Sequence, residues 1–267
     1  MPEHSDLLLW PVALALVYYG GLPLLVGLQQ RYPTAPRLQE LDLEALGPSL
    51  ANFLMTRTRA LFALGFDEPT LVQVPDQAPN VSTYLIMLIN RRTGDKAMVT
   101  ALVGRGAVPL RTMYVEFSTR FESGEVFDTH NSQTLLAFPP APLAVRTQVP
   151  PVNDLEELFR LHTFVMSKHD IRAKKVVYEP GQALDYLVRF VFVKTYEEKV
   201  KRGWMYYDQA GHCYRLTLKG AYRVVGGLLQ PFKALRTLAL HGRARTILKE
   251  FRQPRAAEGG GAYDEPD

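Results

Sequence analysis

The chain has 267 residues, of which 47% are hydrophobic and 22% charged, a composition that excludes a wholly disordered protein. A single cysteine, Cys213, excludes an intramolecular disulfide and a cysteine-based metal site. The net charge of +4 is uneven, because residues 168–255 carry 19 Lys+Arg against 7 Asp+Glu, a net +12, which leaves −8 for the rest. Such asymmetry indicates either a basic surface that meets phosphate groups, from lipid or nucleic acid, or a solvated basic face.

The N-terminal segment from Leu7 to Leu28 contains no charged residue. As a helix it would reach roughly 33 Å at about 1.5 Å per residue, enough for a bilayer core. A cleaved signal peptide is the main alternative, but the flank MPEHSD has no Lys or Arg and no Ala-x-Ala site follows. We therefore predict a single-pass membrane anchor over residues 1–31. Arg31 and Arg37 follow it, so the positive-inside rule places the body in the cytoplasm.

Residues 32–150 are predicted to form an α+β sheet domain. Two prolines mark Tyr32 to Arg37 as a linker, and a helical pattern runs from Leu38 to Leu64, divided at Gly47-Pro48. An antiparallel meander then follows, because β-rich runs alternate with turn signals. The expected strands are Thr70 to Val74, Ser82 to Ile89, Ala97 to Val103, Thr112 to Phe121, Glu125 to Thr129 and Gln133 to Phe138.

Residues 151–253 are predicted to be mainly helical, with Pro139 to Pro151 as the boundary that precedes them. The expected elements are a helix from Asn153 or Asp154 to Lys168, a helix over Gly181 to Lys201, a hairpin of Trp204 to Tyr207 with Cys213 to Leu218, and a helical stretch from Lys219 to Arg252 interrupted near Gly226-Gly227 and Pro231. The Gly-rich tail, residues 254–267, is predicted to be disordered. The fold class is thus α+β with an N-terminal transmembrane helix.

The hairpin region contains the run Tyr214-Arg-Leu-Thr-Leu-Lys-Gly220, which resembles the wing of winged-helix DNA-binding proteins. The resemblance implies that Arg215 and Lys219 contact a phosphate backbone and that the helix within Gly181 to Lys201 enters the major groove. That helix is apolar nearly all round, whereas a reading helix needs an exposed polar face. The alternative is a helix–hairpin–helix module that only packs, with Thr217 capping its last helix.

The stretch from Leu228 to Phe251 places apolar residues near one side, with basic residues between them. A basic amphipathic helix near an anchor could lie on anionic lipid. We therefore single out Lys233, Arg236, Arg243 and Arg245 as candidate phosphate or lipid contacts. The alternative is a helix that packs its apolar stripe on the body.

Asp128, His130 and Asn131 form a polar cluster where a predicted strand ends, and this is the candidate polar site. Catalysis there is one interpretation, and the other is a hairpin end, where Asp, Asn and Ser cap turns. Phosphate-loop, nucleophile-elbow, zinc and dinucleotide motifs are absent from the sequence, so we expect no cofactor.

The order of anchor, sheet with the run from Val115 to Phe121, and the run from Tyr214 to Gly220 is similar to single-pass bacterial membrane proteins without an assigned function. The resemblance implies the architecture and no site residues. Our leading hypothesis is a membrane-tethered, non-enzymatic module that binds a ligand, anionic lipid or partner protein. The first alternative is a membrane-anchored DNA-binding protein, and the second is an enzyme with a site in the sheet domain.

Overall fold

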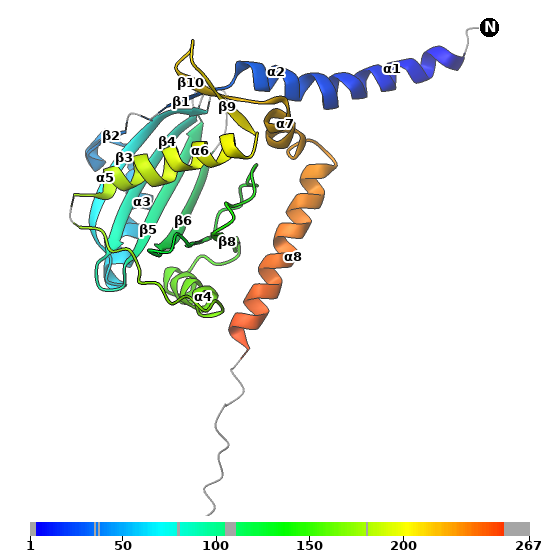
Figure 1. The fold of residues 1–267 in the computed structure, drawn as a ribbon. Coiled ribbons are helices and arrows are strands. Elements are labelled where there is room, and N and C mark those ends of the chain that lie inside the picture. The colour runs from blue at the N-terminus through cyan, green and yellow to red at the C-terminus, as the bar shows by residue number, and fades with distance from the viewer. Residues whose placement is uncertain are drawn as a thin grey trace, which may run out of the picture.

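The computed structural model describes residues 4–34, 36, 38–78, 81–104, 111–179 and 181–253. The chain begins with a long helix made of α1 (His4–Leu16), the π-helical turn η1 (Val17–Gly21) and α2 (Leu22–Gln29). Figure 1 shows this helix as an arm that projects away from the body. Its part Trp10–Gln29 is long and apolar enough to cross a membrane. Of its 18-residue apolar stretch, 11% is buried inside the protein. The predicted apolar N-terminal helix is therefore present.

A seven-stranded sheet in the order β2-β3-β4-β5-β6-β7-β8 forms the centre of the body. Its strands are β2 (Gln39–Glu40), β3 (Asp67–Ala78), β4 (Val81–Asn90), β5 (Asp95–Gly104), β6 (Arg111–Arg120), β7 (Val126–His130) and β8 (Ala144–Gln148). Neighbours are antiparallel from β2 to β7, which confirms the predicted meander. Alternating apolar side chains, such as Val115 and Phe117 in β6, face the core.

The last strand of the sheet differs from the prediction. The prediction of a strand at Gln133 to Phe138 is wrong, because these residues form no strand in the structure. The edge of the sheet is instead occupied by β8, which pairs in parallel with β7. The Gln148 side-chain amide donates hydrogen bonds to the carbonyl oxygens of Ser132 (2.6 Å) and Thr134 (2.9 Å). These bonds hold the segment after β7 beside the sheet edge rather than in the sheet. Two parallel strands need a long connection between them, because the chain must go back to the start of β7 before β8 can run in the same direction.

The residues after the N-terminal helix also differ from the prediction. The expected linker begins with a strand, β1 (Arg31–Pro33), and the helix expected from Leu38 is instead β2 followed by a short 3₁₀ turn, η2 (Leu43–Ala45). The division at Gly47-Pro48 is confirmed, since α3 (Pro48–Ala63) begins at Pro48. Proline suits the first turn of a helix because its missing N–H would have no intrahelical partner there.

Helices cover both faces of the sheet (Figure 1). One face packs on α3 and α4 (Leu155–Ser167), and Ala244 and Leu248 of α8 (Phe232–Arg252) join the same core. A continuous helix made of α5 (Ala183–Tyr186), η3 (Leu187–Val193) and α6 (Lys194–Lys201) crosses the other face. Asp154 caps α4 as predicted, because its carboxylate accepts from the Glu157 N–H at 2.7 Å.

A three-stranded sheet, β1-β10-β9, connects the N-terminal helix to the C-terminal helices. β9 (Met205–Asp208) and β10 (Cys213–Leu216) form the predicted hairpin, and α7 (Leu218–Ala221), η4 (Tyr222–Gly226) and α8 follow. The expected cap is confirmed, since the Thr217 hydroxyl accepts from the Gly220 N–H. The predicted disordered tail lies outside the described residues. The division into a sheet domain and a helical part stays a prediction, although both contribute to one core.

Candidate functional site: an arginine cavity

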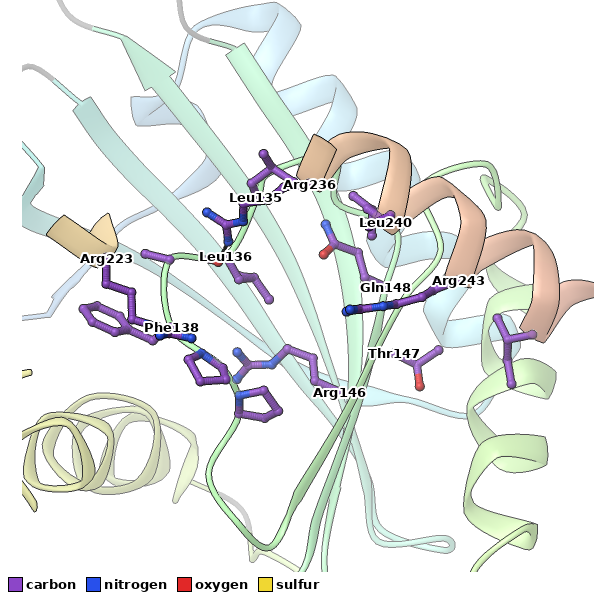
Figure 2. A pocket seen from close by; sticks show the side chains of 15 residues that line it. Leu135, Leu136, Phe138, Arg146, Thr147, Gln148, Arg223, Arg236, Leu240 and Arg243 are labelled. Atoms are coloured by element: carbon purple, nitrogen blue, oxygen red, sulfur yellow. Dashed lines mark hydrogen bonds between the residues drawn. The ribbon is translucent and has the colours of Figure 1, made fainter. Parts of the chain in front are cut away.

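A cavity of about 520 Å³ lies between β8, residues 135–140 and α8. Four of its 15 lining residues are arginines, and Asp and Glu are absent from that lining. Most of the other lining residues are apolar, among them Leu136, Phe138 and Leu240. Figure 2 shows Arg146 reaching into this space from β8 and Arg243 reaching into it from α8. The cavity therefore combines apolar walls with concentrated positive charge.

The four arginines come from three elements, of which β8 is distant in sequence from the other two. Arg146 belongs to the edge strand β8, Arg223 to η4, and Arg236 and Arg243 to α8. Two turns of helix separate Arg236 from Arg243, which places both on the same side of α8. The site thus exists only because α8 turns back along the open edge of the sheet.

Contacts with neutral groups orient two of these arginines. The Arg236 guanidinium donates to the Leu136 carbonyl, and it lies so close to Gly227 that a Cβ there would be 1.9 Å from Nη1. The Arg223 guanidinium lies 5.1 Å from the centre of the Trp204 ring, as in a cation–π contact. Neither contact supplies a negative charge, so both arginines keep their charge available to a ligand.

Arg146 has a carboxylate partner behind the cavity. Its Nη2 lies 3.5 Å from Oδ2 of Asp128, which is longer than a strong charge-assisted hydrogen bond. Asp128 also accepts from the Ser118 hydroxyl at 2.9 Å. These residues belong to a row of polar side chains that crosses the sheet from strand to strand. In the sheet register, Arg146 pairs with Asp128, Asp128 with Ser118, and Ser118 with Lys96. Asp128 contacts only Arg146 among the four arginines, so the cavity keeps a net positive charge.

A second polar row begins at Gln148 in the cavity wall. Gln148 pairs with His130 on β7, and His130 pairs with Glu116 on β6. Burial lowers the pKa of His130 to about 4, helped by Arg146, so the ring is neutral at pH 7. Burial, with the charge of Asp128, raises the pKa of Glu116 to about 8, so this carboxyl group is largely protonated at neutral pH.

The sequence-predicted candidates fall into separate places. Asp128 and His130 lie in the two polar rows, but Asn131 does not join them, because its side chain bonds to the Val115 N–H (2.8 Å) and the Val152 carbonyl (2.9 Å). Arg236 and Arg243 line the cavity, whereas Lys233 and Arg245 do not.

The two candidates of the wing-like hairpin lie near the end of the N-terminal helix instead. Arg215 donates to the Leu28 carbonyl at 2.6 Å, and Lys219 lies 3.4 Å from the Arg202 carbonyl. The α5–α6 helix that would read DNA buries Leu187, Phe192 and Tyr196 against the sheet. The described geometry therefore gives this helix a packing role.

Sequence reasoning did not identify Arg146 and Arg223. Arg146 lies in the strand that was not predicted, and Arg223 lies in a π-helical turn without a charge pattern of its own. The excess of basic residues after Lys168 was the signal available for Arg223. Among the described residues, the structure shows no group of three or more His, Cys, Asp or Glu side chains suited to a metal.

Comparison with known proteins adds no relative to this picture, because no family model, curated protein or solved structure matched the chain.

Proposed function

We propose that the protein is a membrane-tethered binding module whose arginine cavity takes a phosphate-bearing anion. The observation that supports this most directly is the convergence of Arg146, Arg223, Arg236 and Arg243 on one cavity whose lining lacks Asp and Glu. Guanidinium groups match phosphate oxygens in paired, planar hydrogen bonds. The arginines also repel one another in this partly enclosed space, and a bound anion would relieve that repulsion. The apolar walls suit a ligand that carries an uncharged portion next to its phosphate.

The tether and its orientation are part of the proposal. The helix Trp10–Gln29 spans a single bilayer, and the body lies on the cytoplasmic side because Arg31 and Arg37 follow the helix. A position on α8 that is exposed to solvent reports this orientation. In a Cys213→Ala background, Thr246→Cys should react with a membrane-impermeant maleimide only after lysis of the cells. Reaction in intact cells would place the body outside and contradict the orientation.

Binding is tested with the full chain in phosphatidylcholine nanodiscs and inorganic pyrophosphate as the probe. Arg146→Gln and Arg243→Gln should each weaken binding roughly 10- to 100-fold, the effect of losing about 1.5–3 kcal/mol of charge-assisted hydrogen bonding. Arg245→Gln is the matched control, since it removes an exposed arginine of α8 outside the cavity. Equal losses for Arg243→Gln and Arg245→Gln would mean that only general surface charge binds the probe.

Further arms of this experiment separate the sources of the phosphate and the alternative functions. If a lipid headgroup is the ligand, phosphatidylglycerol in the nanodisc should compete with pyrophosphate, and a soluble phosphate ligand predicts no competition. Preference for duplex DNA over pyrophosphate, with steep loss in salt, would favour the DNA-binding alternative. Turnover of the probe that is lost in His130→Ala would favour the enzyme alternative.

A further inference from the structure

Large apolar side chains are exposed along the segment that joins β10 to the middle of α8. We call residues 218–238 the elbow; it comprises α7, η4, the turn after η4 and the first part of α8. Its exposed apolar residues are Leu218, Tyr222, Leu228, Phe232, Leu235 and Leu238. Leu238 is 69% exposed, although leucine is usually buried in a soluble protein. The elbow also exposes Lys219, Arg223 and Lys233, whose long side chains can reach the headgroups while their stems lie beside apolar groups. Large exposed apolar side chains concentrated in one segment indicate a surface that another apolar phase covers.

The elbow contacts the middle of the apolar anchor. The Tyr222 hydroxyl donates to the Gly20 carbonyl at 3.1 Å, and the Tyr19 hydroxyl donates to the Gln230 carbonyl. The rings of Tyr19 and Phe232 meet edge to face, with centroids 6.2 Å apart. The elbow is therefore attached at Tyr19 and Gly20 and not only where the anchor ends.

The position of these contacts along the anchor sets their depth. Gly20 precedes Gln29, the last residue of the apolar span, by nine residues. At about 1.5 Å per residue this separation is roughly 14 Å along the helix axis. The hydrocarbon core of a bilayer is about 30 Å thick, so groups beside Gly20 in a spanning helix lie well below the membrane surface. A body that stopped at the surface could not reach them.

The outward side of α8 changes character along its length in agreement with this depth. Near the anchor α8 exposes Phe232, Leu235 and Leu238, with Lys233 as the exposed charge among them, and farther along it exposes Arg245 and Lys249. Apolar groups suit the acyl chains and basic groups suit anionic headgroups. Figure 1 shows α8 leaving the arm and running away beside the body, so its first turns are the ones nearest the anchor.

We infer that the elbow is inserted in the acyl layer on the same side of the membrane as the body, so that the protein holds the bilayer by a helix and by this second apolar surface. The inference rests on the proposed membrane tether. The lipid is the occupant because the patch is continuous with the anchor and meets it halfway along the apolar span. Arg223 of η4 and Arg236 of α8 belong to the elbow and also line the arginine cavity, so insertion places the cavity next to the membrane, with these two long side chains extending toward the headgroups.

The test places single nitroxide labels on the full chain in liposomes of phosphatidylcholine and phosphatidylglycerol. In the Cys213→Ala background, labels are compared at Leu228→Cys and Leu235→Cys, at Leu14→Cys in the anchor, and at Thr246→Cys on the solvated part of α8. Collision with oxygen, which concentrates in lipid, is measured against collision with a water-soluble nickel complex. We expect the two elbow labels to resemble Leu14→Cys, with at least a fivefold higher oxygen-to-nickel ratio than Thr246→Cys.

The outcomes separate the elbow from the tether. Nickel access at both elbow positions, with Leu14→Cys protected, would overturn the insertion and leave the tether intact. Nickel access at Leu14→Cys would overturn the tether and the insertion with it. Protection of the elbow labels from both reagents would show that protein covers the patch, which also overturns the inference.

Discussion

At the scale of single residues, a buried polar chain joins the sheet to α4. His162 is fully buried, with Nε2 2.8 Å from the Thr119 hydroxyl and Nδ1 3.0 Å from the Thr129 hydroxyl. Thr119 donates to Asp95, which also receives a hydrogen bond from Lys175 at 2.8 Å. Every hydrogen-bonding proton in this chain finds one acceptor in a single arrangement. In it, the Thr129 hydroxyl donates to Nδ1 of His162, and the Nε2–H of His162 donates to the Thr119 hydroxyl. This arrangement requires a neutral histidine and gives the chain a structural role.

Protonation of His162 should therefore destabilise the protein in acid. Burial lowers the pKa of His162 from 6.5 to about 4. Between these two values the unfolded chain binds a proton that the folded protein does not, so the free energy of unfolding falls as pH falls through this window. One such residue accounts for about 3 kcal/mol. Denaturant titrations at pH 7 and pH 4.5 should show a smaller difference for His162→Gln than for the unchanged protein, and equal differences would contradict this assignment.

Lys96 is a second buried basic group, and its charged form lowers stability in the same way at a higher pH. Its ammonium group lies 4.5 Å from the Tyr178 ring centre and 5.1 Å from that of Tyr186. Burial lowers its pKa from 10.5 to about 7. Between pH 7 and 10.5 the unfolded chain binds the extra proton, so stability should rise with pH through that window.

Replacement of Lys96 by methionine tests how much stability the buried charge costs. Methionine has a similar length and no charge, so Lys96→Met should raise the free energy of unfolding at pH 6 by about 1–4 kcal/mol. It should also remove most of the increase in stability between pH 7 and pH 10. Lys96→Ala is the control for the lost volume and should gain less. Destabilisation by Lys96→Met at pH 6 would mean that the cation–π contacts outweigh desolvation.

At the scale of elements, close helix contact fixes the N-terminal helix to the body. A Cβ on Gly27 would lie 2.5 Å from the Ala221 Cβ, so α2 approaches α7 as closely as glycine allows. Gly27→Leu should separate the two helices and make the elbow at least severalfold more sensitive to protease in the full-length protein. Gly20→Ala is the matched control in the same helix, because the added Cβ would meet Tyr222 Oη at 3.9 Å. Equal cleavage of both variants would contradict a specific contact at Gly27.

Elements with local signals were predictable from the sequence. The alternation in β6, the Asp154 cap of α4 and the Thr217 cap of α7 depend on neighbours within a few residues, and the structure has each of them. β8 was missed because its parallel pairing depends on β7, which lies across a long connection. β1 was missed because its partner, β10, follows by about 180 residues.

The cavity was only partly predictable for the same reason. Arg236 and Arg243 were singled out from the basic pattern of one helix, which is a local property. Their proximity to Arg146 and Arg223 depends on the turn after η4 and on the edge position of β8. The burial of Lys96 was also not visible in the sequence, since lysine is normally exposed and Lys96 lies just before the strand expected from Ala97.

At the scale of the whole molecule, α8 joins the elbow, the cavity and the core. Its first part belongs to the elbow, its middle carries Arg236 and Arg243, and its end packs on α4. Phe251 meets Phe164 at 5.5 Å, and two ion pairs, Lys168–Glu250 and Arg252–Glu157, bridge the same two helices. Exposed ion pairs contribute about 0–1 kcal/mol each, so the apolar contact is the stronger attachment.

Loss of the Phe251 contact should therefore release α8 without unfolding the sheet. Phe251→Ala should speed amide hydrogen exchange in the second half of α8 at least tenfold while β4 and β5 exchange at their original rates. The same variant should weaken pyrophosphate binding, because Arg236 and Arg243 move with the helix away from Arg146. Glu250→Gln is the control, since it removes one ion pair and keeps the aromatic contact; it should leave exchange and binding nearly unchanged. Faster exchange throughout the sheet would show instead that α8 and the body unfold as one unit.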